Sequence, residues 1–260
     1  FNAIDSLNYI YNIIPFILAP GNHDIIELKD KNKSKYEVSY GLFNKFFPAN
    51  KFENFPWFGG VYEKGKIQNA YYFLSFSGIK YMVLVMEYAP RDEVIKWANS
   101  VVKEYLMVKT IVVTHAYMAK GNQRLKAGDK DAPKVIDVPY SSNEFKFSEG
   151  DGWANSGEVI WEQFVKNHKN IEFVFSGHSR GPGRLISKGV FGNNIYQIGT
   201  NYQWEKNGGN GYLRIMKFYP KQKKVTVKTY SPLLDSFKQD SENAFEVDLS
   251  GGKFLNTKFP

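Results

Sequence analysis

Three short apolar runs in this chain each lead into a histidine. The pairs are Phe16–Ala19 with His23, Thr110–Thr114 with His115, and Ile171–Phe175 with His178. Short apolar runs bounded by turn residues are typical of buried strands. Ligands bind at the strand ends of open α/β sheets, so we expect the three histidines to lie close together. One such histidine would more often be structural, but three together indicate a site, and the pattern predicts an α/β fold.

The first of these strand ends is the turn Gly21-Asn22-His23-Asp24. An Asn carbonyl oxygen can bind a metal, a His can bind a metal or move a proton, and an Asp can orient that His. Turns rich in Gly and Asn are also common for purely conformational reasons. The turn alone therefore leaves both interpretations open, and the rest of the chain has to supply partners.

Size and composition favour a soluble globular protein. The chain has 260 residues, of which 43% are apolar and 17% aromatic, so a core filled largely by rings is expected. One domain over 1–260 is favoured over two small ones, because no linker-like stretch or repeat occurs. No cysteine is present, which excludes disulfides, thiolate ligands and a thiol nucleophile and leaves the redox compartment open.

Charge and hydropathy restrict the partners. The net charge is +8, but the lysines are scattered among Asn, Asp and Glu, so a solvated surface is favoured over a nucleic-acid groove. No apolar run approaches the ~20 residues that span a bilayer, and no membrane span is expected. The oligomeric state is left open.

Periodicity predicts most of the elements. Helices are expected over 2–12, 38–47, 91–105 and 156–167, and strands over 15–19, 70–76, 79–86, 110–114 and 171–175. After residue 183 the pattern changes to short strands at 184–190, 194–199, 211–219, 223–230 and 244–249. The long polar stretch 117–155 is expected to be a functional or mobile loop, and with the aromatic loop 55–60 it is a candidate pocket wall.

Convergent imidazoles indicate a Zn, Fe or Mn site. The fourth histidine, His168, is expected near a helix C-terminus, where its positive charge would suit the helix dipole. We assign it no role in the site.

The motifs at the three strand ends resemble a known family. In chain order, Gly21-Asn22-His23-Asp24, Val113-Thr114-His115 and Gly177-His178-Ser179-Arg180 resemble the later motifs of calcineurin-like metallophosphoesterases. Stretches such as Phe43–Pro48, Trp57–Gly60 and Thr229–Pro232 look like a bacterial, often exported branch of that superfamily. The resemblance covers about positions 1–250.

This resemblance implies a four-layer α/β/β/α sandwich of two facing mixed sheets, with a two-metal centre at the strand ends. The family has an Asp after its first strand and a Gly-Asp motif after its second, whose Asp bridges both metals. Neither motif occurs here, because the sequence begins at Phe1, downstream of them. The chain is therefore expected to be the C-terminal part of an N-terminally truncated domain.

The resemblance also implies roles for individual residues. Asn22, His115 and His178 match the ligands of one metal, which would be Mn, Fe or Zn, with one or two ions bound. His23 matches the residue that contacts phosphate and protonates the leaving group, and Asp24 matches its orienting partner. Arg180 stands where the family has a second histidine. A guanidinium cannot bind a cation, so Arg180 either clamps a phosphate oxygen or lies in a surface loop.

The implied activity is hydrolysis of a phosphomonoester or phosphodiester by a metal-activated hydroxide, with His23 as general acid. An alternative is an impaired metallophosphoesterase module with a structural or partner-binding role. A nuclease would use the same chemistry on another substrate. An exported location is expected from the resemblance alone.

Overall fold

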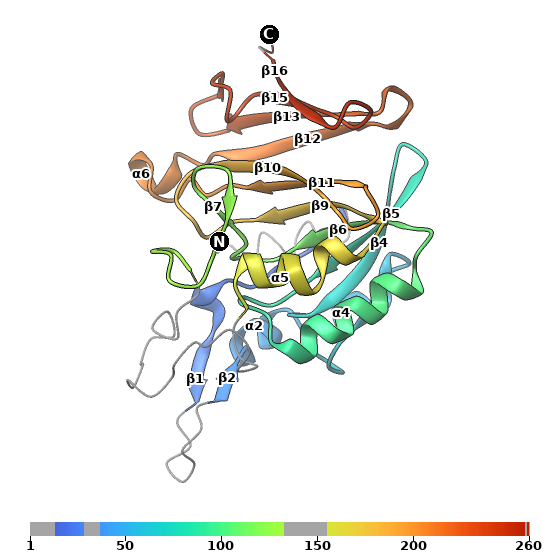
Figure 1. The fold of residues 1–260 in the computed structure, drawn as a ribbon. Coiled ribbons are helices and arrows are strands. Elements are labelled where there is room, and N and C mark those ends of the chain that lie inside the picture. Colours follow the sequence, from blue (N-terminus) through green and yellow to red (C-terminus); the bar gives the residue numbers. More distant parts are fainter. Residues whose placement is uncertain (1–13, 29–36, 133–154, 258, 260) are drawn as a thin grey trace.

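The computed structural model describes residues 14–28, 37–132, 155–257 and 259. Its centre is a seven-stranded sheet, which faces a second sheet on one side and helices on the other (Figure 1). In spatial order, the large sheet consists of β10 (Gly183–Lys188), β11 (Asn194–Gly199), β9 (Ile171–Ser176), β6 (Lys109–Val113), β5 (Ile79–Val85), β4 (Ala70–Phe76) and β3 (Phe58–Val61).

Four adjacent strands of the large sheet run parallel. β11, β9, β6 and β5 pair in parallel, whereas β10, β4 and β3 pair antiparallel at the two sides. The carboxyl ends of the four parallel strands therefore lie at the same edge of the sheet, on the left in Figure 1. This edge is where an α/β sheet binds its ligands.

Two helices cover one face of the large sheet, α4 (Asp92–Glu104) and α5 (Gly157–Gln163). α4 turns its apolar side chains, among them Val94, Ala98 and Val102, toward the sheet residues Leu84 and Val112. This packing explains the 3.6-residue spacing of apolar residues in the sequence.

The second sheet covers part of the opposite face. Its strands are β12 (Leu213–Tyr219), β13 (Lys224–Ser231), β14 (Ser236–Lys238), β15 (Phe245–Asp248) and β16 (Lys253–Asn256). The core between the two sheets contains Tyr81, Phe173 and Tyr196 from the large sheet, packed with Val225 and Phe245 from the second. Such burial on alternate residues is what a half-buried strand requires, and β13 shows it along its whole length.

The rest of the opposite face is covered by a third cluster around Tyr72 and Phe52. This cluster includes Phe43 of α2 (Gly41–Phe46) and Phe52 of α3 (Asn50–Glu53). The short strands β1 (Ile26–Leu28) and β2 (Glu37–Ser39) pair with each other in a separate two-stranded sheet. The remaining strands and α-helix of the described residues are β7 (Met118–Ala119), β8 (Gln123–Arg124) and α6 (Lys206–Gly209), and short 3₁₀ helices occur at Asn22–Asp24, Val165–Asn167 and Pro220–Gln222.

The structure confirms the predicted α/β class with two facing sheets and corrects several details. All pairs of the second sheet are antiparallel, whereas the resemblance implied a mixed sheet, and short turns join β12 to β13, β13 to β14 and β15 to β16. α4 and α5 form the helical layer, and Figure 1 shows no helix beyond the second sheet among the described residues.

The predicted strand at 15–19 is wrong. Residues 15–20 form neither helix nor strand, although Phe16 and Ile17 pack into the core. Proline at positions 15 and 20 removes a backbone donor at each end of the run, which disfavours a strand. The predicted helix 38–47 is shorter, α2, and follows β2. The predicted helix at 2–12 and most of the long loop lie outside the described residues.

Candidate metal centre

Three of the four parallel strands each bring one aromatic ring to the edge of the sheet. Tyr88 follows β5, His115 follows β6, and His178 follows β9. The rings of His115 and His178 meet edge to face with centroids 5.0 Å apart. Tyr88 contacts both rings, with centroid distances of 5.7 Å to His115 and 5.5 Å to His178. The predicted convergence of His115 and His178 is therefore observed.

The Gly21–Asp24 turn reaches the same place. Residues 22–24 form one 3₁₀ turn, in which Gly21 N–H donates to the Asp24 carboxylate over 2.7 Å and Asp24 N–H donates to Gly21 C=O over 3.1 Å. Asn22 is buried, and its Oδ1 lies 3.1 Å from Nε2 of His115. His23 and Asp24 are exposed at the surface of the turn.

Gly21 is required by space rather than by backbone conformation. Its φ is −103°, which any residue adopts. A Cβ at this position would lie 2.9 Å from Cε1 of His115, closer than van der Waals contact allows. The missing side chain therefore lets the turn approach His115 closely enough for Asn22 to reach its ring.

His178 lies at the centre of a tight three-residue turn. Its φ is +62°, and Ser179 N–H donates to Gly177 C=O over 2.8 Å, which closes a γ-turn. Asn201, after β11, donates from its side chain to His178 C=O over 2.7 Å. The backbone C=O of Asn201 accepts a hydrogen bond from Gly181 N–H over 3.1 Å. A left-handed conformation costs energy for a non-glycine residue, and such strain is often found at functional sites.

Burial keeps His115 neutral. Desolvation, followed by the nearby His178 and His23, lowers the pKa of His115 to about 4. The ring is therefore uncharged at neutral pH. A neutral imidazole is the form that binds a metal ion.

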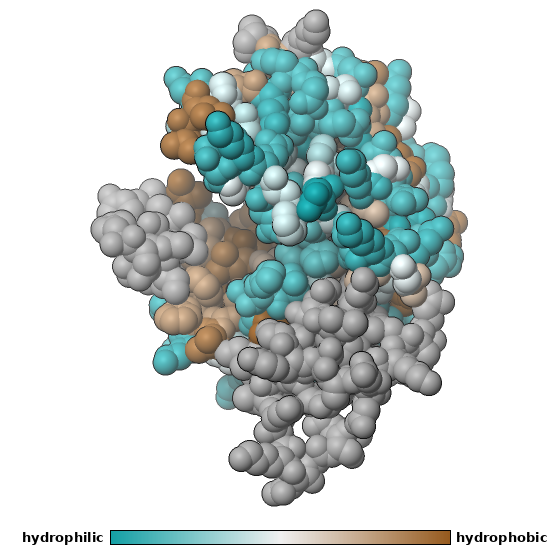
Figure 2. Space-filling view, turned by 90° about the vertical axis from the view of Figure 1, so that its left-hand side faces the viewer, coloured by the Kyte–Doolittle hydropathy of each residue, from teal (hydrophilic) through white to brown (hydrophobic). Residues whose placement is uncertain are grey.

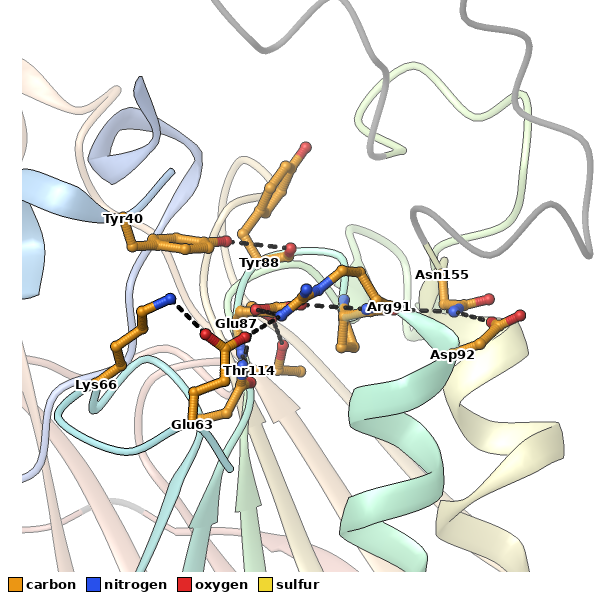
Figure 3. A network of polar contacts seen from close by, with 11 residues as sticks. Tyr40, Glu63, Lys66, Glu87, Tyr88, Arg91, Asp92, Thr114 and Asn155 are labelled. Carbon is orange, nitrogen blue, oxygen red and sulfur yellow. Dashed lines mark hydrogen bonds and ion pairs between the residues drawn. The ribbon is translucent and has the colours of Figure 1, made fainter. Parts of the chain in front are cut away.

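A polar network is centred on the buried Glu87, the residue before Tyr88 (Figure 3). Glu87 accepts from Arg91 Nε over 2.8 Å and from Asn69 Nδ2 over 2.7 Å, and Arg91 also bonds Glu63, which pairs with Lys66. The hydroxyl of Thr114, next to His115, donates to Glu87 C=O over 3.2 Å. This network ties the loop after β5 to the end of β6 and so fixes Tyr88 against the histidines.

Tyr88, Glu87 and Asn201 were not predicted as site residues from the sequence. All three follow parallel strands, just as the histidines do. Met86-Glu87-Tyr88 directly after an apolar strand was the available signal. The pattern of 70–76 and 79–86 predicts two strands, but it does not show that the second one ends at the same edge as 110–114 and 171–175.

Asn22 and His115 fit a shared cation. Two ligands held about 2.1 Å from one metal ion at angles of 90–109° lie about 3.0–3.4 Å apart. The 3.1 Å between Asn22 Oδ1 and His115 Nε2 falls within this range. An amide oxygen can only accept, so a proton on Nε2 bridges the two atoms here, in the position where a cation would lie. The His178 ring lies beside this pair, and together they offer one amide oxygen and two imidazoles.

The described part of the chain contains no cluster of three or more His, Cys, Asp or Glu side chains that could hold a metal. The candidate ligands Asn22, His115 and His178 do not form such a cluster, because Asn22 is not one of these four residue types.

The remaining predicted site residues take other contacts. The carboxylate of Asp24 bonds Gly21 within the turn, so a role in orienting His23 stays a prediction. Arg180 is exposed, and its guanidinium lies over the indole of Trp204, 4.5 Å from the ring centroid. This stacking is compatible with both predicted roles of Arg180, a clamp on a phosphate oxygen or a place in a surface loop.

His168 directly follows the 3₁₀ helix Val165–Asn167, so its predicted position at a helix C-terminus is confirmed, but its charge state differs from the prediction. It is buried, and its Nε2 lies 2.7 Å from Asn99 Oδ1 on α4. Burial, with a further contribution from Lys103, lowers its pKa, so the neutral ring is favoured rather than a charged one at a helix end.

Figure 2 faces the edge at which the parallel strands end. Hydrophilic residues cover the middle of this face, and hydrophobic residues gather toward its left-hand side. No helix among the described residues is long and apolar enough to cross a membrane.

Comparison with known proteins agrees with this geometry. Residues 2–181 match the family described as calcineurin-like phosphoesterase. The chain is also 26% identical over 246 residues to the uncharacterized protein YvnB of Bacillus subtilis (strain 168). That match covers 92% of this chain but only 16% of YvnB, so the chain spans about a sixth of this relative. The family match covers more than half of the chain and includes all three motifs, and the chain therefore belongs to the calcineurin-like phosphoesterase family.

Proposed function

We propose that this chain contributes to metal-dependent hydrolysis of a phosphoester. The main support is the approach of Asn22 Oδ1 and His115 Nε2 to 3.1 Å, with the ring of His178 beside them, at the carboxyl ends of parallel strands. Membership of the calcineurin-like phosphoesterase family supports the same reaction class. The substrate is a phosphomonoester or a phosphodiester.

Asn22, His115 and His178 would hold the metal ion, which would be Mn, Fe or Zn. The lowered pKa of His115 supports this role, because its nitrogen lone pair is available at neutral pH without competition from a proton. A bound ion of this kind supplies an activated water and neutralises charge on the phosphoryl oxygens.

His23 would act as general acid. It is exposed on the turn that carries Asn22, so a substrate bound beside Asn22 lies within reach of its imidazole. An imidazole in this position can deliver a proton to the departing alkoxide. The hydrogen bonds between Gly21 and Asp24 hold the turn, and with it the backbone of His23, in place.

Metal content and turnover test this proposal together. The full-length protein should contain about one to two Mn, Fe or Zn ions per chain and hydrolyse bis-p-nitrophenyl phosphate, and chelators should abolish this activity. His115→Ala should lower metal affinity by at least 10–100-fold, the loss typical of residues that only support ligands. His168→Gln, in a histidine outside the site, is the matched control. Full-length protein without metal or hydrolysis would contradict the proposal.

A non-catalytic module is the second candidate. It is supported by the lack of a His, Cys, Asp and Glu cluster in the described residues and by arginine at position 180, where the family has a histidine. Such a module would bind a partner or serve a structural role. His23→Ala would then leave the biological role intact, whereas loss of function in that variant would favour the enzyme.

An exported location stays a prediction from the resemblance. Fractionation of cells that produce the full-length protein tests it, with a cytosolic protein as marker.

A further inference from the structure

Six turns lie at the edge of the molecule opposite the candidate metal centre, on the right in Figure 1. Four of them precede the parallel strands β5, β6, β9 and β11, and two join strands of the second sheet, β12 to β13 and β15 to β16. Leu249 N–H donates to Lys223 C=O over 2.9 Å, and the backbone of Gly252 packs against Asn194 at the start of β11, so the turns of both sheets meet. Together they form the amino-end edge of the molecule. With their flanking residues the turns comprise 77–80, 103–109, 168–172, 188–194, 220–224 and 248–253.

Positive charge is concentrated on the amino-end edge. These six stretches contain nine lysines and three acidic residues, so they carry a net charge of +6, whereas the whole chain carries +8. Lys109 pairs with Glu172, and Lys103, Lys169 and Lys188 are exposed. Lysines that are scattered along the sequence are thus brought together by the fold, and this edge presents a positive potential to its surroundings.

Exposed apolar side chains lie at the tips of two of the turns. Met107, between α4 and β6, is 91% exposed, and Leu106 beside it is also exposed. Val190 and Phe191, between β10 and β11, are 60% and 64% exposed. Single exposed apolar residues are common on protein surfaces and need no explanation. These four residues, however, share one edge with most of the net charge.

Hydrogen bonds hold both apolar turns in place. The side chain of Asn170 donates to Tyr105 C=O and to Val108 C=O, each over 3.2 Å, on either side of the tip between α4 and β6. Val190 N–H donates to Lys166 C=O over 2.9 Å. The apolar tips are therefore presented on fixed backbone, and a partner that buries them need not order the turns first.

We infer that the amino-end edge binds the surface of an anionic lipid bilayer, with Met107 and Phe191 inserted between the headgroups. Such a surface attracts lysines through its headgroups and buries apolar side chains at the boundary of its acyl chains, so it is complementary to this edge in both respects. The phosphates of a nucleic acid would attract the same lysines but would leave the apolar tips in water. The inference is independent of the proposed function, and the candidate metal centre would face away from the bilayer.

Sedimentation of the full-length protein with sucrose-loaded vesicles tests the inference. Vesicles of phosphatidylcholine and phosphatidylglycerol in equal parts should bind the protein at least about tenfold more tightly than vesicles of phosphatidylcholine alone. Binding should weaken as the salt concentration rises, because ions screen exposed charges. Lys169→Gln combined with Lys188→Gln should lower the affinity for the mixed vesicles and make it less dependent on salt.

A second pair of substitutions tests the apolar tips. Met107→Ser combined with Phe191→Ser should lower the affinity for the mixed vesicles at least about tenfold, because both side chains would lose their burial in the bilayer. Both residues are largely exposed, so the fold should be unaffected, and thermal unfolding checks this. Leu233→Ser is the matched control, in a residue 67% exposed on the turn at the other end of β13.

No binding to the mixed vesicles, equal binding to both kinds of vesicle, or unchanged binding in the double serine variant would overturn the inference. Retention of duplex DNA in place of vesicles would also overturn it, in favour of a nucleic acid. Treatment with a chelator should leave vesicle binding unchanged, because the amino-end edge contains none of the candidate metal ligands. If the protein binds the mixed vesicles through these residues but hydrolyses no phosphoester, the proposed function fails and this inference stands.

Discussion

Tyr88 and His178 contact each other across the end of β6, with ring centroids 5.5 Å apart. They follow β5 and β9, the two neighbours of β6 in the sheet. His115, which follows β6, contacts both of them. The ring of Tyr88 is thus a fixed side of the space in which the two imidazoles meet.

Tyr88→Ala should therefore loosen the candidate metal centre. The side chain is only 6% exposed, so its loss should lower the free energy of unfolding by about 3 kcal/mol or more. Metal affinity should fall by about 10–100-fold, as for other residues that hold ligands in place. Tyr88→Phe keeps the ring and should keep metal affinity; calorimetry and urea unfolding measure both quantities. A full loss of affinity in Tyr88→Phe would show that the hydroxyl, not the ring, matters.

Gly21→Ala should displace the ring of His115. The new Cβ would meet Cε1 at 2.9 Å, and relief of such a clash costs about 1–3 kcal/mol. Gly177→Ala is the control, because its nearest neighbour would be Thr200 C=O at an ordinary 3.7 Å. We expect metal affinity to fall in the first variant and to change little in the second. Similar affinities in both variants would argue against the packing of Gly21 on His115.

The backbone of His178 can be separated from its side chain. His178→Ala and His178→Gly both remove the imidazole and should both lose metal. Because φ is +62°, the Gly variant should be more stable than the Ala variant by about 1 kcal/mol, as measured by chemical unfolding. Equal stabilities of the two variants would mean that the γ-turn relaxes once the imidazole is removed.

His168 should make the protein less stable in mild acid. Its folded pKa lies below the unfolded value of about 6.5, so as pH falls the unfolded chain takes up the proton first. The free energy of unfolding should therefore decrease as pH falls below about 6.5, until the folded pKa is reached. His115 titrates in the same sense, so the difference between wild type and His168→Gln isolates the contribution of His168. Parallel pH curves for the two proteins would contradict this prediction.

Much of the fold could be predicted because its signals are local. The apolar runs at 110–114 and 171–175 and the amphipathic pattern at 91–105 correspond closely to β6, β9 and α4. The prediction of a strand at 15–19 was wrong because a strand needs a hydrogen-bonded neighbour, and the hydropathy of the side chains does not indicate whether one is present. The backbone conformation of Asn207–Gly211 could not be predicted either. Its Gly and Asn content predicts a turn, but not five successive residues with positive φ.

The candidate site could be predicted in part. His115 and His178 follow from strand order, and Asn22 followed from the resemblance. Tyr88 and Asn201 carry no motif, and their importance comes from contacts made across the sheet edge. The stacking of Arg180 on Trp204 likewise depends on two loops that meet only in the folded protein.

The position of the site at the ends of four parallel strands also bears on how the protein folds. Asn22, Tyr88, His115, His178 and Asn201 are far apart along the chain, and parallel strands can pair only after the long connections between them have closed. Closure of such connections slows folding. Metal affinity should therefore be among the last properties to appear during refolding, after helical circular dichroism has recovered, and cutting the chain between β6 and β9 should delay it further.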